Sequence, residues 1–275
     1  MKNIRYRFLL YFILLLLSVG YLIYRYYFLE NVSDFHKEIL VTTAIGFIMT
    51  TIVGLYEIAK NNGKYSWLAI KCWLLIPNKL VYVSLSYLIK IKLPGSERYL
   101  LVKGSKINQY QPVGGVYKLV GNKDITKDWN ASVKPDTKNP RDLRFFIKAK
   151  HLPDVLKWFK SGKDRELGVW REFREELIDN KILTVDNFNS IRTEYLYSKE
   201  NLLSKQTRFN NEKYHSLVYN IFCIELNESQ LSELIKLEQN KLFTKKYAFV
   251  TEDEISKECF NDSKTRIGQH TKHII

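Results

Sequence analysis

Three glutamates on one predicted helix are the residues whose spacing points most directly to chemistry. They lie in the segment GVWREFREEL, Gly168–Leu177, at positions i, i+3 and i+4: Glu172, Glu175 and Glu176. At about 100° per residue, these carboxylates share one face of a helix and the apolar residues between them share another. Like charges at this spacing repel one another, so the acidic face favours a bound cation. A hard divalent ion such as Mg²⁺, which prefers oxygen ligands, is the natural one.

The same acidic face has a structural explanation that needs no metal. Arg171 stands four residues before Glu175, which is the spacing of an intrahelical ion pair. Charged faces of this kind are common on solvent-exposed helices. Spacing alone therefore leaves both interpretations open.

A mixed set of strands and helices is predicted around this acidic helix. Alternation and turn residues predict strands at 81–93, 98–103, 144–149, 192–197, 216–226 and 247–250. Helices are predicted at 153–160, 167–180, 228–239 and from 252 onward. The paired glycines Gly114 and Gly115 permit a turn or a close approach of two backbone segments. The fold class is therefore mixed α/β.

Two long apolar runs precede the α/β part. Residues 8–24 carry no charge, and residues 39–59 carry only Glu57. At about 1.5 Å per residue, both runs approach the thickness of the hydrocarbon core of a membrane, about 30 Å. We therefore predict a two-helix transmembrane hairpin over residues 1–59, with spans at about 8–24 and 39–59. A juxtamembrane segment follows over residues 60–79.

Basic residues flank the two spans and predict their orientation. The flanking positions are Lys2, Arg5 and Arg7 before the first span, and Lys60, Lys64, Lys71 and Lys79 after the second. The link between the spans holds only Arg25 and Lys37. The positive-inside rule then places both termini of this multi-pass protein in the cytoplasm.

Other interpretations of the apolar segments remain open. Ser18-Val19-Gly20 offers the small residues of a signal-peptide cleavage site, and both runs fit the length of core helices in a soluble protein. Residues 67–76 are apolar but contain Lys71 and end at Pro77, so they are too short to span. This segment fits either a helix along the inner leaflet or an ordinary packing helix.

Overall charge and cysteine usage narrow the class of partner. Forty-three Lys and Arg against 29 Asp and Glu give a net charge of +14, which favours anionic partners such as phosphates, nucleic acid or anionic lipid.

The three cysteines, Cys72, Cys223 and Cys259, lie far apart with no CxxC pair, so neither a disulfide framework nor a structural zinc site is predicted. Each cysteine is expected to be a small buried hydrophobe.

Two further groups of residues are weaker candidates for a site. Arg141 and Arg144 belong to a basic stretch that fits phosphate binding as well as it fits a solvated or lipid-facing surface. His270 and His273 have the spacing of a shared metal site, but they stand near the C-terminus. A frayed, exposed terminus is the expectation there.

The acidic helix resembles the signature of the Nudix family. Arg171–Leu177, REFREEL, matches the second half of that signature, and Pro112–Gly115 is similar to the Pro-Gly-Gly turn that precedes it. The resemblance covers about residues 80–275 and implies a Nudix-like mixed sheet sandwiched by helices.

The resemblance also implies roles for individual residues. Glu172, Glu175 and Glu176 would bind Mg²⁺ or Mn²⁺ and activate a water that attacks a pyrophosphate, with Arg171 positioning Glu172. The backbone carbonyl of Gly115 would complete the metal ligands. Glu238, after the predicted strand at 216–226, is the candidate for an extra carboxylate from a late loop.

The chain departs from the family pattern at three features. Gly115 and Arg171 are 56 positions apart, far more than in the family, which predicts an insertion over about residues 121–163. Lys163 stands where the first glutamate of the signature is expected, and Ile178 where its last glycine is expected. This degenerate signature leaves open whether the domain is a pyrophosphohydrolase or only binds its ligand.

A two-span hairpin followed by such a domain resembles the transmembrane Nudix effectors of CBASS, the cyclic-oligonucleotide-based anti-phage signalling systems of bacteria. The resemblance implies a domain that senses a cyclic oligonucleotide made by a partner nucleotidyltransferase, and homo-oligomers that form when this ligand binds. The membrane or the nucleotide pool of the infected cell would then be impaired. No nucleic-acid polymer is expected as a partner.

Two alternative functions stay open: a Mg²⁺-dependent hydrolase of nucleoside diphosphate derivatives at the inner membrane, and a catalytically inert membrane adaptor.

Overall fold

The chain forms two compact units. The computed structural model describes residues 2–28, 34–104, 107–121, 124–133, 139, 141–205, 212–260 and 265–275. The helical unit comprises Met1–Lys79 and Lys148–Ser161, and the sheet unit comprises Leu80–Ile147 and Gly162–Ile275. Residues 148–161, inside the predicted insertion, therefore group with the N-terminal part. The predicted domain limits themselves remain a prediction.

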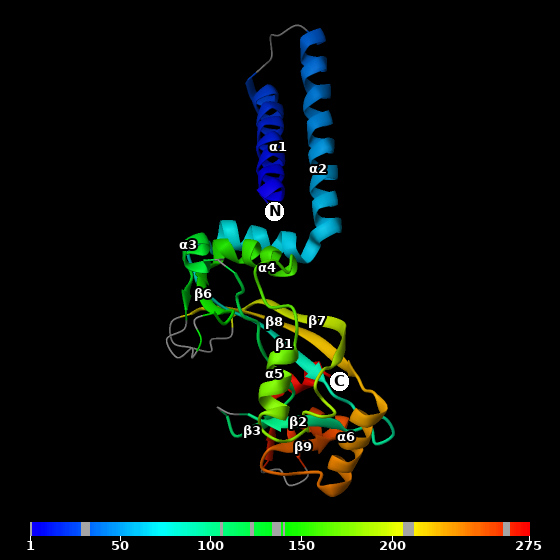
Figure 1. Ribbon diagram of the computed structural model, residues 1–275. Coiled ribbons are helices and arrows are strands. Elements are labelled where there is room, and N and C mark those ends of the chain that lie inside the picture. Colours follow the sequence, from blue (N-terminus) through cyan, green and yellow to red (C-terminus); the bar gives the residue numbers. More distant parts are fainter. Residues whose placement is uncertain are drawn as a thin grey trace. The chain divides into compact units, whose positions relative to one another are not determined.

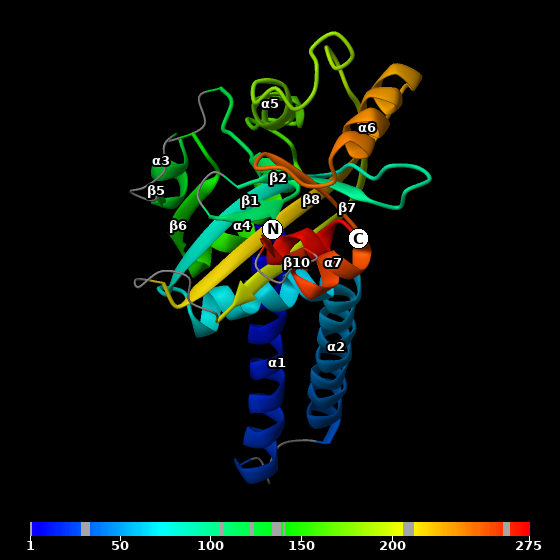
Figure 2. The same ribbon diagram turned by 90° about the horizontal axis from the view of Figure 1, so that it is seen from below.

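The helical unit is built on two long helices that lie side by side (Figures 1 and 2). These are α1, Lys2–Phe28, and α2, Asp34–Ile70, which is followed by a π-helical turn, Lys71–Leu75. The residues that link α1 to α2 lie outside the described part. The helices approach closely at Gly54, where a Cβ atom would collide with the ring of Tyr11. The second chain segment of the unit adds a 3₁₀ turn, Ala149–His151, and α4, Leu152–Lys160.

Both long helices are apolar and exposed. Leu9–Tyr27 on α1 and Glu38–Glu57 on α2 are long and apolar enough to cross a membrane, and only 6% and 17% of their most apolar windows are buried. A core helix of a soluble protein would be mostly buried. The N-terminal part therefore exposes two apolar helices that could form a hairpin, as the sequence predicts.

The sheet unit contains two sheets. In the first, the order is β5-β6-β1-β8-β7, with β4 pairing β1, and the strands are β1 Leu80–Lys90, β4 Val113–Val116, β5 Ser132–Val133, β6 Arg144–Lys148, β7 Arg192–Ser204 and β8 Tyr214–Glu225. In the second, the order is β10-β11-β3-β2-β9, and the strands are β2 Tyr99–Lys103, β3 Gln109–Gln111, β9 Tyr247–Val250, β10 Cys259–Phe260 and β11 Thr265–Ile267. Strand β1 pairs in parallel with β8 and antiparallel with β4, so the first sheet is mixed.

Helices accompany both sheets. They are α3 Ile125–Trp129, α5 Trp170–Phe173 with a π-helical turn at Arg174–Ile178, α6 Glu228–Asn240, α7 Glu252–Lys257 and a 3₁₀ helix at Gln269–His273. The mixed α/β class is therefore confirmed. The Gly114-Gly115 pair lies within β4 rather than in a turn, because β1 gives it a hydrogen-bonding partner.

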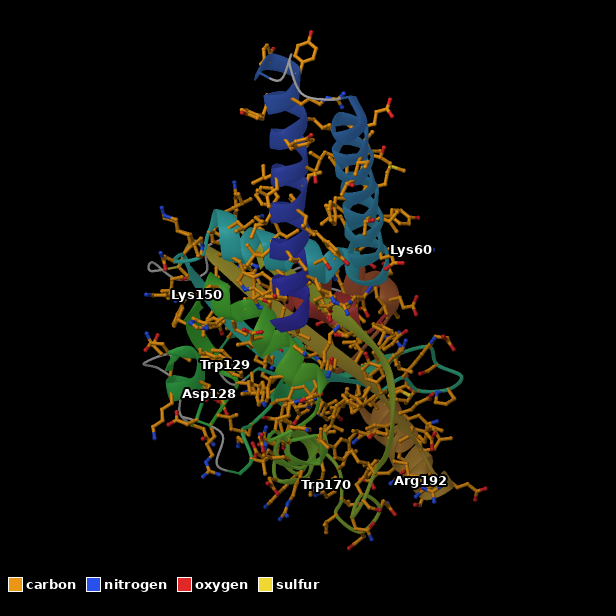
Figure 3. All side chains as sticks on the ribbon, turned by 90° about the horizontal axis from the view of Figure 1, so that it is seen from above. Lys60, Asp128, Trp129, Lys150, Trp170 and Arg192 are labelled. Carbon is orange, nitrogen blue, oxygen red and sulfur yellow. The ribbon has the colours of Figure 1, made fainter. Side chains whose placement is uncertain are left out.

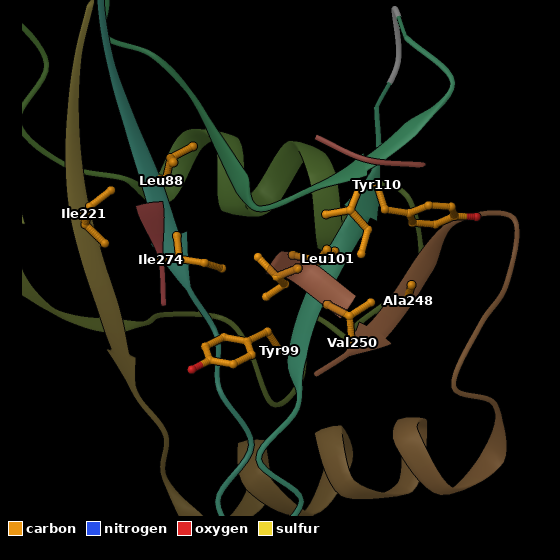
Figure 4. Packing of buried hydrophobic residues seen from close by; sticks show 10 residues of the cluster. Leu88, Tyr99, Leu101, Tyr110, Ile221, Ala248, Val250 and Ile274 are labelled. Carbon is orange, nitrogen blue, oxygen red and sulfur yellow. The ribbon is translucent and has the colours of Figure 1, made fainter. Parts of the chain in front are cut away.

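The core of the sheet unit draws on both sheets. Figure 4 shows Leu88 of β1 and Ile221 of β8 in the same cluster as Leu101 of β2 and Val250 of β9. Ile274 joins this cluster and is fully buried. The expectation of a frayed C-terminus was therefore wrong, because an apolar residue next to the last position anchors the end of the chain.

The cysteines behave only partly as expected. All three thiols are free, and Cys72 is fully buried in the helical unit, where burial raises its pKa to about 12. Cys223 and Cys259 are partly exposed, so the expectation of full burial is correct for Cys72 only.

Candidate functional site

Two glycines of β4 bring the backbone of this strand close to its neighbours. Gly114 pairs with Leu88 of β1, and a Cβ atom on Gly114 would collide with the carbonyl oxygen of Tyr87. A Cβ atom on Gly115 would collide with the carboxylate of Glu172. The glycine pair is therefore required by close packing, and the acidic helix lies directly against it.

The acidic helix is anchored by its apolar face and interrupted in its middle. Phe173 and Leu177 are fully buried, and the Phe173 ring lies 5.7 Å from that of Phe188. The α-helix ends at Phe173 and continues as a π-helical turn, closed by a 2.9 Å bond from the Asp179 amide to the Arg174 carbonyl. The predicted helix over 167–180 is thus shorter and irregular. Single π turns of this kind are frequent at functional sites, because they redirect side chains.

Arg171 is the centre of the polar network. Its Nε and Nη2 atoms donate to Oε1 and Oε2 of Glu166, each at 3.1 Å, and Nη2 also donates to the Val116 carbonyl at 3.0 Å. Its Nη1 atom donates to Glu172 and lies 3.6 Å from Oε1 of Glu175. A guanidinium with bidentate and carbonyl partners has a fixed orientation. Arg171 thus contacts Glu172, and its role in positioning Glu172 for catalysis remains a prediction.

Glu166 is a site residue that the sequence analysis missed. It pairs with Arg171 from five residues upstream, whereas Lys163 occupies the position that the family spacing assigns to such a glutamate. The loop before the acidic helix therefore brings to Arg171 a carboxylate that the family spacing does not predict. The sequence shows Glu166 only as a glutamate three residues after the expected position. The fold of the loop is needed to see that it contacts Arg171.

Glu176 is held on the β4 side of the site. The Gly114 amide donates to its Oε2 atom at 3.0 Å. Burial raises the pKa of the Glu176 carboxyl to about 8, and the charges of Glu172 and Glu175 act in the same direction. Burial also raises the pKa of Glu172, against the opposing effect of Arg171. Glu176 is therefore mostly protonated at neutral pH.

The donor atoms suit a hard divalent cation, although the side chains are not arranged around one. Within the described residues, no three His, Cys, Asp or Glu side chains converge as a metal site, because Glu172 faces Arg171 and Glu176 faces the Gly114 amide. Glu172 nevertheless lies against Gly115 and Glu176 binds the Gly114 amide, and oxygen ligands are those that Mg²⁺ and Mn²⁺ prefer. The roles of Glu172, Glu175, Glu176 and the Gly115 carbonyl as metal ligands remain predictions.

A sequence comparison decides the family. The SMODS-associated NUDIX domain matches residues 80–275, which is more than half of the chain. The chain belongs to this family. The match confirms the Nudix resemblance and puts this Nudix domain in a CBASS-like context. No curated protein and no solved structure matches the chain significantly.

The other predicted ligands of the Nudix domain lie apart from the Arg171 network. Glu238 of α6 pairs with Arg98, with 3.9 Å between Oε1 and Nε, and Arg98 also lies 3.8 Å from Glu254. Arg141 is exposed and Arg144 is partly exposed on β6. The proposed roles of Glu238 as a metal ligand and of the two arginines as phosphate ligands remain predictions.

Tyr87 is a second residue of the Nudix site that the sequence did not single out. Its side chain is fully buried on β1, and its hydroxyl has no hydrogen-bond partner among the described residues. Burial raises the pKa of this phenol, and the neighbouring charges of Glu166 and Glu172 raise it further. The hydroxyl therefore stays a neutral donor beside the acidic residues.

Proposed function

We propose that the chain is a membrane-anchored Nudix effector of CBASS antiviral defence, and that its Nudix domain responds to a cyclic oligonucleotide made by a partner nucleotidyltransferase. The observation that carries this proposal is the SMODS-associated NUDIX match over residues 80–275, in a chain that begins with two exposed apolar helices. The net charge of +14 fits an anionic ligand.

The proposed anchor is a two-span hairpin in the bacterial inner membrane, with both termini in the cytoplasm. Lysines and arginines precede the first span and follow the second, and the link between the spans contains few of them. In this orientation the Nudix domain faces the compartment in which a nucleotidyltransferase would make the ligand.

Ligand binding would act through assembly. A cyclic oligonucleotide that favours a homo-oligomer of the Nudix domain also gathers the hairpins, and gathered hairpins impair the bilayer. The ligand shifts the equilibrium between monomer and oligomer only if it binds the oligomer more tightly. The fraction of oligomer should therefore rise with the ligand concentration.

A second candidate function is Mg²⁺-dependent hydrolysis of nucleoside diphosphate derivatives, which would impair the nucleotide pool. The observation that favours it is the Glu166–Arg171 pair, because this pair supplies from a shifted position the carboxylate that the signature lacks at Lys163. Glu172, Glu175, Glu176 and the Gly115 carbonyl would hold Mg²⁺ or Mn²⁺, which when bound lowers the pKa of a coordinated water. Arg171 would hold Glu172 in place, and Glu176 would release its proton.

The deciding experiment uses the full chain in lipid vesicles that contain a dye. Light scattering in detergent and dye leakage from the vesicles are measured with a panel of cyclic di- and trinucleotides. The effector proposal expects larger particles and leakage with at least one cyclic compound, and it expects both to survive Glu176→Gln. Cleavage of a linear nucleoside diphosphate compound that Glu176→Gln abolishes, without any response to cyclic compounds, would establish the hydrolase instead. No response to either class would leave the inert adaptor.

A further inference from the structure

The helical unit brings together two segments that are far apart in the sequence. The end of α2 and its π turn pack against the Ala149–His151 turn and α4. The Trp73 indole donates to the Lys150 carbonyl at 3.0 Å, and the Ala149 amide donates to the Lys79 carbonyl at 2.8 Å. Figure 1 shows the last part of α2 turning away from the line of the two long helices, with α4 beside it. We call residues 60–79 and 148–161 together the basic platform.

The α2 part of the basic platform has one covered face and one uncovered face. Leu68, Ala69 and Cys72 are buried. Trp67, Leu74 and Leu75 are 63%, 59% and 65% exposed. One side of this segment therefore packs against the rest of the helical unit, as expected of an ordinary packing helix, which was one of the two interpretations of residues 67–76. Its other side exposes three large apolar side chains directly after a predicted span.

Lysines surround this exposed apolar face. Residues 60–79 contain four lysines and no acidic residue, and residues 148–161 contain four lysines and only Asp154. Lys60, Lys64, Trp67, Lys71 and Leu74 follow one another at spacings of four and three residues, which places them along a single helical stripe. Figure 3 labels Lys60 on the first segment and Lys150 on the second.

We propose that the basic platform is a binding surface for anionic lipid headgroups, in which Trp67, Leu74 and Leu75 insert at the level where the headgroups meet the acyl chains. This proposal rests on the proposed membrane anchor and goes beyond it. Alternation of lysines with large apolar residues along one stripe is the pattern of a helix that lies in a membrane interface. Lysine stems can cover apolar surface while their ammonium groups reach the headgroup phosphates.

Lipid fits this surface better than another class of partner. The uncovered face follows the candidate span Glu38–Glu57 along the same stretch of chain, which favours a membrane surface as its partner. The charge balance of eight lysines against one aspartate complements the anionic inner leaflet. A second copy of the same basic surface would repel it.

The test places the full chain in bilayers in which one lipid carries bromine near the top of its acyl chains. Quenching of Trp67 is taken as the difference between the wild type and Trp67→Phe. Brominated phosphatidylglycerol is compared with brominated phosphatidylcholine at equal mole fraction, and acrylamide probes exposure to water. We expect Trp67 to be quenched by lipid and shielded from acrylamide, with a preference for phosphatidylglycerol of about five-fold or more.

A four-lysine variant tests the source of this preference. The variant Lys79→Gln, Lys148→Gln, Lys150→Gln and Lys157→Gln changes four exposed side chains of the basic platform and should lower the preference, because half of its eight lysines lose their charge. The matched control changes four exposed lysines of the sheet unit, Lys213, Lys236, Lys241 and Lys245, to Gln and should keep the preference.

The outcomes separate this proposal from the anchor on which it rests. Release of the chain from membranes at alkaline carbonate pH would refute the predicted spans. Retention of the chain with Trp67 quenched by acrylamide and not by brominated lipid would refute the lipid-binding platform alone. Protection of Trp67 from both quenchers would also refute it, because a protein partner would then cover the face.

Discussion

Replacing Glu176 by glutamine is expected to stabilise the metal-free protein at alkaline pH. Glu176 accepts a hydrogen bond from the Gly114 amide, and its pKa of about 8 lies far above the ordinary value of 4.5. Glutamine resembles the protonated carboxyl, still offers an oxygen to Gly114 and cannot ionise. The variant therefore keeps the neutral state that the fold prefers.

The sign and size of the effect follow from proton linkage. Between pH 4.5 and about 8, the folded protein binds more protons at Glu176 than the unfolded chain does, so the free energy of unfolding falls as the pH rises across this window. At about 1.4 kcal/mol per pKa unit, the full loss above pH 8 is about 5 kcal/mol. Partial access of solvent makes this an upper limit. For a unit of this size it corresponds to about 10 °C in Tm.

The assay is thermal unfolding of the full chain in detergent, followed by tryptophan fluorescence at a series of pH values with a chelator present. Wild type and Glu176→Gln should agree near pH 4, diverge up to about pH 8 and stay apart above it, with the variant more stable. Glu175→Gln is the matched control, because it makes the same change of side chain at a position that is 52% exposed. Its Tm should diverge from that of the wild type much less than the Tm of Glu176→Gln does.

Added Mg²⁺ provides the second arm. Near pH 7, which lies below the Glu176 pKa of about 8, a cation must displace the Glu176 proton, so the apparent metal affinity of the wild type should rise with pH until about pH 8. Glu176→Gln should lose most of the Tm gain that Mg²⁺ or Mn²⁺ confers. A pH-independent difference between wild type and variant, or an unchanged metal response, would refute the burial argument for Glu176.

Three further outcomes are expected. Glu166→Gln should lower stability by about 1 to 2 kcal/mol in urea unfolding, because it breaks a partly buried bidentate pair with Arg171; an unchanged midpoint would show that this pair is dispensable. Gly115→Ala should weaken Mg²⁺ binding in calorimetry, since the new Cβ displaces the Glu172 carboxylate, and wild-type affinity would contradict the close contact. A reporter fused after Ile275 should be active only in the cytoplasm, and one inserted at residues 32–36 only in the periplasm; the reverse pattern would overturn the predicted orientation.

The longer strands and the position of the acidic helix were predictable because their signals are local. Strand β1 is a nearly continuous apolar run, and β9 follows the same rule over four buried residues. The Arg171–Leu177 match lies within two helical turns, so the contact of Arg171 with Glu172 needs no distant partner. The predicted orientation of the two apolar helices likewise rests only on the lysines and arginines next to them in the sequence.

Features created by tertiary contacts were not predictable. Lys163 holds the expected position of the first glutamate, and only the folded loop brings Glu166 to Arg171 instead. The pairing of Trp73 with Lys150 joins residues 77 positions apart, which no local pattern encodes. Ile274 gives no sequence signal of burial either, because a single apolar residue near a terminus is equally common on a surface.

The packing of α4 on α2 limits where this chain can be divided into fragments or joined to another anchor. The family match begins at residue 80 and includes α4, whose apolar face of Leu152, Val155, Leu156 and Phe159 is buried within the helical unit. A fragment that starts at Leu80, or a hybrid with an unrelated N-terminal anchor, would leave this face uncovered and prone to aggregation. The N-terminal segment and the helix α4 of the insertion therefore form one structural unit, although the family match includes only the second of them.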